Sequence, residues 1–388
     1  MGITQHVHGT NNARCLAALA LMCGQVGRPG AGLHPLRGQN NVQGASDVGI
    51  LPTFLPGYRR VDDDQARNGF EELWQTPLPS RPGLTVVEMI HGALDGALRG
   101  MLIMGENPAM SDPDITTVRK GLAALDHLVV QEIFLTETAA FADVILPASA
   151  QPEKAGTYTN TNRQVQMGRP ALEPPGEARQ DWAILQELGR RLGLQWDYSG
   201  AGDIWEELRR SWPALAGISW RRLESEDAVT HPCAGEDQPG QAVILGEKFN
   251  TANGLGKFVA VDIVSPAEMP DAEFPMVLTT GRLLEHWHTG AMSRRADVLD
   301  RIEPEAIAHL APADLGRLDV APGQPVVLCT RRGTIRLAAR ADASLPEGMV
   351  FVPFCFSEAP GNALTKAALD PISKIPEYKF CAVRVERA

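Results

Sequence analysis

Apolar and polar positions alternate most regularly between residues 84 and 150. The spacing predicts two helices and three short strands, over 85–98, 114–125, 101–104, 127–134 and 144–146. Helices that alternate with short, continuously apolar strands are typical of parallel βαβ units. In such sheets ligands bind outside the carboxyl ends of the strands. The segments that follow the first two strands, Gly105-Glu106-Asn107 and Thr136-Glu137-Thr138, are therefore candidates for ligand contacts.

The pattern changes near residue 272, where short apolar runs separated by turn residues predominate. They predict strands over 274–280, 325–330, 333–341, 348–354 and 381–386. Arg331-Arg332-Gly333 is typical of a hairpin turn, and His309 to Gly316 is expected to form a short helix. Many short strands with little helix between them favour a closed or barrel-like β domain.

The other parts of the chain have weaker periodicity. Residues 11–23 and 180–192 are expected to be helical, and 56–82 are expected to be a polar surface stretch. Residues 24–49 are rich in glycine and lack apolar periodicity, which predicts a long loop. A loop of this length in a compact domain is usually functional or disordered. Its polar centre, the run R-G-Q-N-N-V-Q-G from Arg37 to Gly44, favours function.

Composition excludes several classes of protein. The chain has 388 residues, 44% of them hydrophobic, and a formal net charge of −11, which argues against nucleic acid as a partner. It has no apolar run of about 18 residues, so no membrane span is expected. Six scattered cysteines without a C-x-x-C pair do not indicate a zinc or iron–sulfur site, and they fit a reducing, cytoplasmic location. Cys15 and Cys23 are expected to lie on one buried helix face.

Three groups of motifs together resemble the molybdopterin oxidoreductase superfamily. The first is G-I-T-Q-H at residues 2–6 with the run at 37–44. The second is G-E-N-P at 105–108 with F-A-D-V-I-L-P at 141–147. The third is T-G-R-L-L-E-H-W-H-T-G-A-M-S-R-R at 280–295. The run at 37–44 and the end of the chain are most similar to formate dehydrogenase alpha subunits, and the resemblance covers essentially the whole chain.

The resemblance implies a fold, which agrees with the pattern described above. It implies an α/β fold with a C-terminal β-barrel, consisting of a partial doubly wound α/β domain, a small mixed domain and a double-psi β-barrel dinucleotide-binding domain. The expected borders are 1–38 for the end of a substrate domain, 39–150 for the partial molybdopterin-binding α/β domain, 151–271 for a mixed connecting region and 272–388 for the barrel. Two molybdopterin guanine dinucleotides and one molybdenum or tungsten ion are the implied cofactors.

The implied catalytic residue is Arg37. Its planar, permanently charged guanidinium can orient formate, a small planar carboxylate, and the neighbouring glycines allow a close approach of the backbone. The implied cofactor-binding residues are polar groups and glycines that match the motifs of the family, with amides for pterin edges, a carboxylate for guanine, and hydroxyls, backbone amides and arginine for phosphates. They are Gln5, Gln39, Gly105, Glu106, Asn107, Gln131, Thr136, Asp143, Gly281, Arg282, His286, His288, Thr289, Ser293, Asn362 and Lys379. For Asp143 a role in capping the start of a strand is an equal alternative.

The H-x-H pair of His286 and His288 resembles a metal site, and the spacing would let both rings point one way on a strand. No third protein ligand is evident nearby, and the family uses these positions for pterin contacts. No protein ligand to a metal is therefore expected in this chain.

The chain also departs from the family pattern. The cysteine or selenocysteine that ligates the metal, and the iron–sulfur domain, have no counterpart here, so the cluster is expected only in a missing N-terminal part. Three explanations stay open, namely a fragment, one half of a split enzyme completed by a second chain, or a remnant. We expect that the chain alone does not oxidise formate.

The resemblance predicts part of a formate dehydrogenase, which converts formate to carbon dioxide when complete. Its partners would be the missing N-terminal half or a complementing chain, and electron-transfer subunits. One alternative is a non-catalytic molybdopterin-binding or scaffold module of an electron-transfer complex. Another is a related oxidoreductase with a different substrate, such as nitrate. The metal, its ligand and the electron acceptor cannot be predicted from these residues.

Overall fold

A computed structural model describes residues 1–388, which form two compact units, each built from separated pieces of the chain. We call residues 1–16, 86–146 and 260–388 the barrel unit, and residues 17–85 and 147–259 the connector unit. The predicted division at residues 38, 150 and 271 stays a prediction. No helix of the structure is long and apolar enough to span a membrane.

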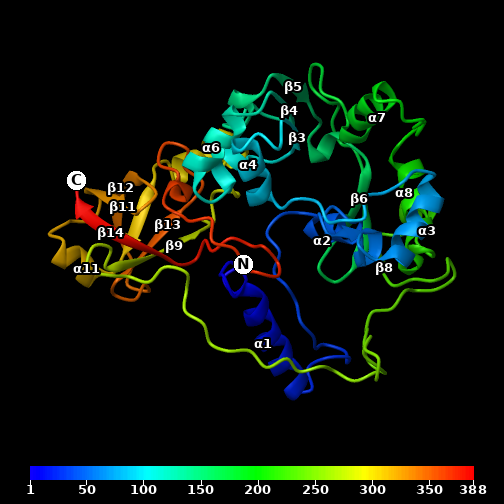
Figure 1. Ribbon diagram of the computed structural model, residues 1–388, viewed down its shortest axis with the longest axis horizontal. Coiled ribbons are helices and arrows are strands. Elements are labelled where there is room, and N and C mark those ends of the chain that lie inside the picture. Colours follow the sequence, from blue (N-terminus) through cyan, green and yellow to red (C-terminus); the bar gives the residue numbers. More distant parts are fainter. The chain divides into compact units, whose positions relative to one another are not determined.

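The α/β part of the barrel unit contains a three-stranded sheet in the order β3-β4-β5, with helices on one face (Figure 1). Its elements are α4 (Val86–Leu94), β3 (Gly100–Met104), α5 (Pro108–Ser111), α6 (Ile115–Ala123), β4 (His127–Glu132), the 3₁₀ turn η2 (Ala139–Phe141) and β5 (Val144–Pro147). Strands β3 and β4 are parallel, with Met104 opposite Gln131 at their carboxyl ends. The predicted alternation of helices and strands is confirmed.

The two faces of this sheet differ. Ile103, Leu128 and Val130 are buried in one core with Ile90 of α4 and Leu122 of α6. On the alternate positions, Leu102 is 45% exposed and Met104 is 41% exposed. Val144 and Ile145 of β5 are also exposed. Because successive side chains of a strand point to opposite faces, the exposed residues of β3 define a second, apolar face of the sheet.

The C-terminal part of the barrel unit is a closed barrel of six strands in the order β10-β12-β11-β14-β9-β13 (Figure 1). Its strands are β9 (Met276–Gly281), β10 (Ile307–Leu310), β11 (Pro325–Cys329), β12 (Thr334–Ala341), β13 (Met349–Pro353) and β14 (Cys381–Arg387). Between them lie η5 (Ser293–Arg295), α10 (Asp297–Ile302), α11 (Pro312–Arg317) and η6 (Gly361–Ala363). Alternate residues such as Val326 and Leu328 point inward and are fully buried. The predicted barrel is confirmed.

One predicted element of the barrel was wrong. His309 and Leu310, expected at the start of a helix, belong to β10, which pairs with β12 and β13 to close the barrel. The helix begins at Pro312 and extends to Arg317, beyond Gly316. Proline is well tolerated in the first turn of a helix, where its missing N–H has no partner to lose. The barrel therefore uses residues that local pattern alone assigned to the helix.

The connector unit contains small sheets and short helices (Figure 1). Its elements are α2 (Val42–Asp47), β1 (Phe54–Leu55), η1 (Pro56–Tyr58), β2 (Arg59–Arg60), α3 (Asp64–Trp74), η3 (Gln151–Glu153), β6 (Gly156–Thr159), β7 (Gln164–Gly168), α7 (Asp181–Arg191), α8 (Ala201–Ser211), η4 (Pro213–Leu215), α9 (Trp220–Ser225) and β8 (Val229–Thr230). The predicted loop 24–49 thus contains a short helix, and the predicted surface stretch 56–82 contains α3. Asp63 begins α3 by accepting hydrogen bonds from the amides of Gln65 and Ala66.

Helix α1 (Gly9–Met22) confirms the helix expected over 11–23, but the expected burial of its cysteines was wrong. Cys15 and Cys23 are both exposed, and so are Leu16 and Leu19. Spacing by eight residues places two side chains on one face, but that face is buried only where another element packs against it. Gly9 is the buried residue of this helix.

Candidate functional site

The structure distributes the predicted site residues over both units. Arg37 and Gln39 belong to the connector unit, and the others belong to the barrel unit. Within the barrel unit they gather in two places, the carboxyl ends of β3 and β4, and the loop after β9 with the segment before β14.

The loop after β3 is fastened to the loop after β4. The Gly105 amide donates to the Gln131 carbonyl over 2.9 Å, and Gly105 has a φ of +63° with open space where a side chain would lie. Asn107 accepts from the Thr138 hydroxyl over 2.8 Å and donates to Glu137 over 2.8 Å. A polar loop is therefore fixed at the sheet edge where ligands bind in folds of this kind.

The hydroxyl of Thr136 accepts from the amide of Ala139 over 3.3 Å, which holds the start of η2. Thr136 is buried, and so is Gln131 at the end of β4. Both residues therefore support the loops at this edge.

Two acidic groups at this edge have raised pKa values. The pKa of Asp112 is raised to about 7, first by burial and also by the negative charge of Glu106. The pKa of Glu106 is raised by desolvation and by Glu132. Oδ2 of Asp112 is buried and has no hydrogen-bond partner. Sequence reasoning missed Asp112, which follows the one-turn helix α5 in a segment without a periodic signal.

Asp143 lies apart from these residues. Its amide donates to the Leu128 carbonyl over 2.9 Å, and its carboxylate accepts from the Leu128 amide over 2.7 Å. Leu128 is the second residue of β4, so Asp143 lies near the amino end of that strand, whereas Gly105 pairs with Gln131 near its carboxyl end. These contacts favour the capping role that sequence analysis gave as the alternative.

The loop after β9 is shaped by tight packing and internal hydrogen bonds. Gly281 lies against Phe351, whose ring carbon would be 2.2 Å from any added Cβ atom. The hydroxyl of Ser293 accepts from the amide of Trp287 over 2.8 Å, and Ser293 and Thr289 are both buried. The guanidinium of Arg282 lies 5.6 Å from the ring centre of Trp287.

The two histidines of this loop have different surroundings. His286 is buried, and its Nε2 lies 2.7 Å from the Glu303 carbonyl oxygen. His288 has a φ of +51° and packs edge-on against Phe354, with ring centres 5.4 Å apart. Burial and the charge of Arg282 lower the pKa of His288 to about 4. The rings belong to a loop rather than a strand, and the structure contains no group of three His, Cys, Asp or Glu side chains that could hold a metal.

A positively charged group lies close to this loop. The ammonium of Lys379 donates to the Thr280 carbonyl, and its backbone amide donates to the Gln5 carbonyl over 3.4 Å. Burial, followed by the charge of Arg282, lowers the pKa of Lys379 to about 8. Gln5, Arg282 and Lys379 are thus brought together from three distant parts of the sequence.

Asn362 has mainly structural contacts. It is 2% exposed, and its side-chain amide donates to the carbonyls of Met110 and Ser111, each over 2.9 Å. Both amide hydrogens are used in this tie between η6 and α5. Its cofactor contact stays a prediction.

The two groups of residues carry the kinds of donor and acceptor that a dinucleotide would require. A diphosphate requires cationic and N–H donors, which Arg282 and Lys379 supply, and their mutual repulsion would be relieved by an anion. Guanine presents N–H groups, for which a desolvated carboxyl group such as that of Asp112 is a suitable acceptor when ionised. The open space over Gly105 also admits a ligand close to the backbone.

In the connector unit Arg37 is held by the helix that follows it. Its Nη1 donates to the Val42 carbonyl over 3.2 Å and to the Ser46 hydroxyl over 2.8 Å. Gln39 is half-buried in the same loop. The charge of Arg37 also acts on Tyr58, whose pKa is nevertheless raised, mainly by burial and by Asp47.

A buried polar cluster lies behind this helix and was not anticipated. Asp47 is 3% exposed. One oxygen of its carboxylate accepts from the side-chain amide of Gln43 over 2.7 Å and from the hydroxyl of Tyr58 over 2.9 Å. Its other oxygen lies 3.2 Å from Nε2 of the buried His231. The sequence gives no signal for this cluster, because His231 is 184 residues from Asp47.

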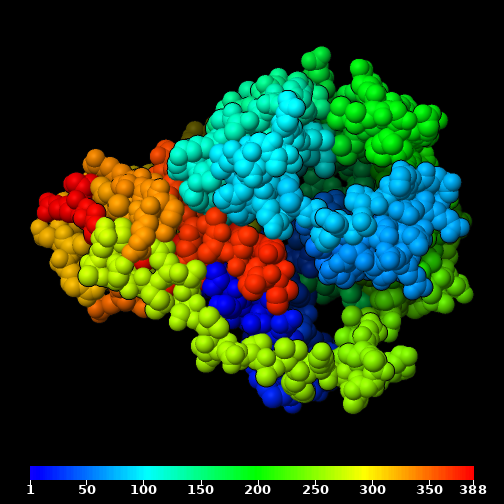
Figure 2. Space-filling model, in the orientation of Figure 1, coloured from blue at the N-terminus to red at the C-terminus, as the bar shows by residue number.

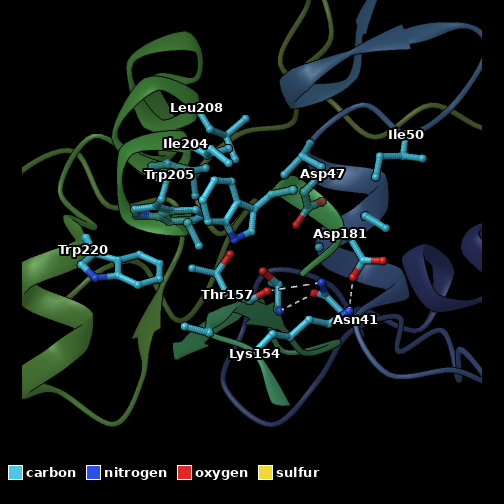
Figure 3. A pocket seen from close by; sticks show the side chains of 18 of the residues that line it. Asn41, Asp47, Ile50, Lys154, Thr157, Asp181, Ile204, Trp205, Leu208 and Trp220 are labelled. Carbon is cyan, nitrogen blue, oxygen red and sulfur yellow. Dashed lines mark hydrogen bonds and ion pairs between the residues drawn. The ribbon is translucent and has the colours of Figure 1, made fainter. Parts of the chain in front are cut away.

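A pocket of about 330 Å³ adjoins α2 (Figure 3). Tryptophans dominate its wall, namely Trp182, Trp205, Trp212 and Trp220. The polar side chains at its edge are already paired, since Lys154 contacts Asp181, and Asn41 bonds to the backbone of Thr157 and Thr159. Because its wall is aromatic and its polar groups are paired, the pocket favours an apolar occupant. Arg37 and Gln39 do not line it, so it is separate from the predicted substrate residue.

Comparison with known proteins identifies the domains. The Molybdopterin oxidoreductase family matches residues 1–191, and the Molydopterin dinucleotide binding domain matches residues 276–382. An F420-dependent formate dehydrogenase subunit alpha of Methanocaldococcus jannaschii is 46% identical over 389 residues, which cover all of this chain and 57% of the relative. Formate dehydrogenase H of Escherichia coli is 36% identical, over all of this chain and 54% of the relative.

The chain therefore spans little more than half the length of these curated relatives. Acetylene hydratase from Pelobacter acetylenicus shares the fold, with a TM-score of 0.64 and 18% identity over 84% of this chain and 50% of that protein. The two family matches lie on the segments that carry the polar sheet edge and the cationic barrel loop. The chain belongs to the molybdopterin oxidoreductase superfamily, and its relatives include formate dehydrogenase alpha subunits.

Proposed function

We propose that this chain is part of a formate dehydrogenase catalytic subunit, which oxidises formate to carbon dioxide when complete. The observation that carries the proposal is the 46% identity to a formate dehydrogenase alpha subunit across the entire chain. The retained polar groups of the predicted site support a cofactor-binding role over a purely structural one. The proposed location is the cytoplasm.

Arg37 is the proposed substrate-orienting residue. The bonds from Nη1 to Val42 and Ser46 fix the guanidinium plane relative to α2. A fixed planar cation suits a planar carboxylate, because the fork needs no reorganisation when the substrate binds. A lysine at this position would keep the positive charge but would lack the two parallel N–H donors of a guanidinium.

The proposed cofactor is a pair of molybdopterin guanine dinucleotides with molybdenum or tungsten. When bound, the metal supplies the two-electron acceptor that formate oxidation requires. Arg282 and Lys379 would hold negative phosphate charge, and Gln5 and Gln39 would contact pterin edges. Glu106, Asn107 and Asp112 would line the nucleotide end.

No cysteine of this chain lies in the sequence context of the family's metal ligand, and two of the six, Cys355 and Cys381, are also poor candidates by their pKa values. Burial raises the pKa of Cys355 to about 12 and also raises the pKa of Cys381, so both stay neutral thiols near neutral pH. Thiolates, not thiols, bind metals. We therefore propose that the metal ligand, the iron–sulfur cluster and the contacts to electron-transfer subunits come from the remainder of the polypeptide or from a complementing chain.

Dye reduction with formate tests the proposal. The 388-residue chain alone is expected to be inactive, and the complete subunit is expected to reduce the dye in the presence of formate. Arg37→Lys in the complete subunit should raise KM and lower kcat/KM by about 10- to 100-fold, since a charged hydrogen-bonded contact is worth about 1.5–3 kcal/mol. Arg28→Lys, a change at an exposed arginine of the same loop, is the matched control.

Formate-dependent dye reduction by the isolated chain would refute the missing-ligand argument. A complete subunit that retains the dinucleotide but reduces no dye with formate would favour a scaffold module. Reduction of nitrate instead of oxidation of formate would favour the other substrate.

A further inference from the structure

Three consecutive residues before β14 each contact a different part of the barrel unit. The hydroxyl of Tyr378 donates to the Ser111 carbonyl over 3.1 Å, which ties it to the α/β part. The ammonium of Lys379 donates to the Thr280 carbonyl at the end of β9. Glu377 contacts a third set of partners, which belong to residues 1–10, to the segment that precedes β9 and to the segment after η6.

Glu377 is completely buried, with 0% of its surface exposed. Its Oε1 accepts from the Val7 amide over 3.3 Å and lies 3.9 Å from Nδ1 of His6. Its Oε2 accepts from the Ala267 amide over 3.2 Å and lies 2.9 Å from the ammonium of Lys366. One carboxylate therefore joins three segments that are far apart in the sequence.

A second carboxylate fastens the same segment. Asp370 accepts from the amide of Thr10 over 3.0 Å and from its hydroxyl over 2.8 Å. Residues 5–10 are thus held at Val7 and at Thr10 by the segment that precedes β14, and Figure 2 shows the blue N-terminal residues beside this red-orange segment. Between Val7 and Lys379 lies the Gln5 carbonyl, which accepts from the Lys379 amide.

A buried ion pair is by itself weak evidence for stability, because apolar residues of similar volume often stabilise a core as well or better. The pair of Lys366 and Glu377 could be replaced in this way. Apolar side chains could not accept from the amides of Val7 and Ala267, so they would leave those donors without their partner. The carboxylate is needed for the placement of the segment rather than for the core.

We propose that Glu377 is a positioning residue that holds Gln5 beside Lys379 and thereby forms one wall of the dinucleotide site. The proposal rests on the proposed function, since it assigns that wall to the molybdopterin guanine dinucleotide. Glu377 touches neither cofactor nor substrate in this role and acts through the segment from Gln5 to Val7.

The test compares two variants of the full protein with a control. Glu377→Gln leaves Lys366 with only the more distant Glu268, 4.0 Å away, as a charge partner, and it places an amide N–H₂ against a backbone donor. The double change Glu377→Leu with Lys366→Met removes both charges together and should preserve the fold. Glu386→Gln changes an exposed glutamate of the adjacent strand β14 and is the matched control.

Two measurements are made on protein from cells that synthesise the dinucleotide. The first is amide hydrogen exchange at Val7, and the second is the guanine nucleotide and oxidised pterin released on heating, per mole of chain. The double variant should fold with a lowered melting temperature, because the amides of Val7 and Ala267 lose their acceptor. It should exchange at least about tenfold faster at Val7 and retain about tenfold less cofactor, as is typical when a supporting residue is lost. Glu386→Gln should change neither quantity.

A double variant that folds with full protection at Val7 and full cofactor would overturn the proposal. Loss of the fold in both variants would also overturn it, because Glu377 would then be structural. If wild-type protein retains no dinucleotide, the proposed function fails, while exchange at Val7 still decides whether Glu377 positions the segment.

Discussion

Lys379 is a half-buried lysine whose charge depends on its surroundings. Its pKa is lowered to about 8 by burial and by Arg282, so the unliganded site holds its proton less tightly than free lysine does. An anion placed between these two cations would restore the charged form. Binding of a phosphate group and protonation of Lys379 are therefore linked.

We predict that affinity for a phosphate-bearing ligand falls as the pH rises through 8. Guanosine diphosphate is a suitable probe, measured by calorimetry between pH 7 and 9.5. Lys379→Met should weaken its binding at pH 7 by about tenfold and flatten the pH dependence, because a charged hydrogen bond is worth about 1.5–3 kcal/mol. Lys120→Met, at an exposed lysine of α6, should do neither. A pH profile that survives Lys379→Met would contradict the assignment.

The same residue affects stability in the opposite direction. A lysine whose pKa is lower in the folded state than in the unfolded state binds fewer protons when folded between about pH 8 and its usual value of 10.5. The free energy of unfolding should therefore rise over this range from this group, and its penalty is fully present below pH 8. Below pH 8, where charged Lys379 would bind an anion most strongly, its burial therefore lowers the free energy of unfolding.

At the scale of the element, Gly281 shows why a site residue is fixed by packing. It ends β9 opposite Pro353 of β13, and the ring of Phe351 occupies the place of a side chain. A glycine in a strand interior often marks such a close approach. The loop that carries Arg282 therefore leaves the barrel at a point set by an aromatic ring.

We predict that Gly281→Ala destabilises the barrel by about 1–3 kcal/mol, because overpacking forces neighbouring side chains to move. Urea unfolding followed by circular dichroism would measure the change. The double change Gly281→Ala with Phe351→Leu makes room and should recover part of the loss. Equal stability of the single variant and the wild type would show that the ring moves freely.

Local patterns predicted the regular elements well and the exceptions poorly. The strands of the sheet, the barrel strands other than β10, and helix α7 were predicted from apolar runs and periodicity. His309 and Leu310 were assigned to a helix because barrel closure with β12 and β13 is a non-local event. Helix α3 was missed because most of its residues are polar, and only a few apolar residues, including the buried Phe70, form its inner face.

The predicted site residues all come from motifs, and their roles stay predictions. The motifs gave Gln5, Arg282 and Lys379, and the structure brings them together. Asp112, Glu377 and the cluster of Asp47 with His231 were missed, because their importance arises from burial and from partners far away in sequence. Asp143 was grouped with the sheet edge by motif, although its bonds are to the start of β4.

At the scale of the whole molecule, the uncovered face of the β3-β4-β5 sheet is the most unusual surface. Parallel sheets are normally covered on both faces, yet Leu102 and Met104 are exposed on one face of β3, and Val144 and Ile145 of the edge strand β5 are exposed as well. Exposed apolar side chains on a sheet of this kind favour an interaction site or a tendency to associate. We expect the proposed complementing chain, or the remainder of the polypeptide, to pack against this surface.

We predict that the isolated 388-residue chain self-associates through this face. Sedimentation velocity at micromolar concentration should show oligomers, and Leu102→Thr with Ile145→Thr should shift the chain toward the monomer. Leu192→Thr, at an exposed leucine of the connector unit, is the matched control. An unchanged distribution in the double variant would place the association elsewhere.

The fastening of Val7 and Thr10 by Glu377 and Asp370 has a consequence for biosynthesis. These partners are 370 and 360 residues apart. At about 5–20 residues per second, a ribosome needs roughly 20 to 70 s to add the second partner after the first. During this interval the segment with Gln5 has none of its final contacts to Glu377, Asp370 or Lys379. Gln5 can meet Lys379 only once β14 has left the ribosome, so the dinucleotide that we propose would find this side of its site open until then.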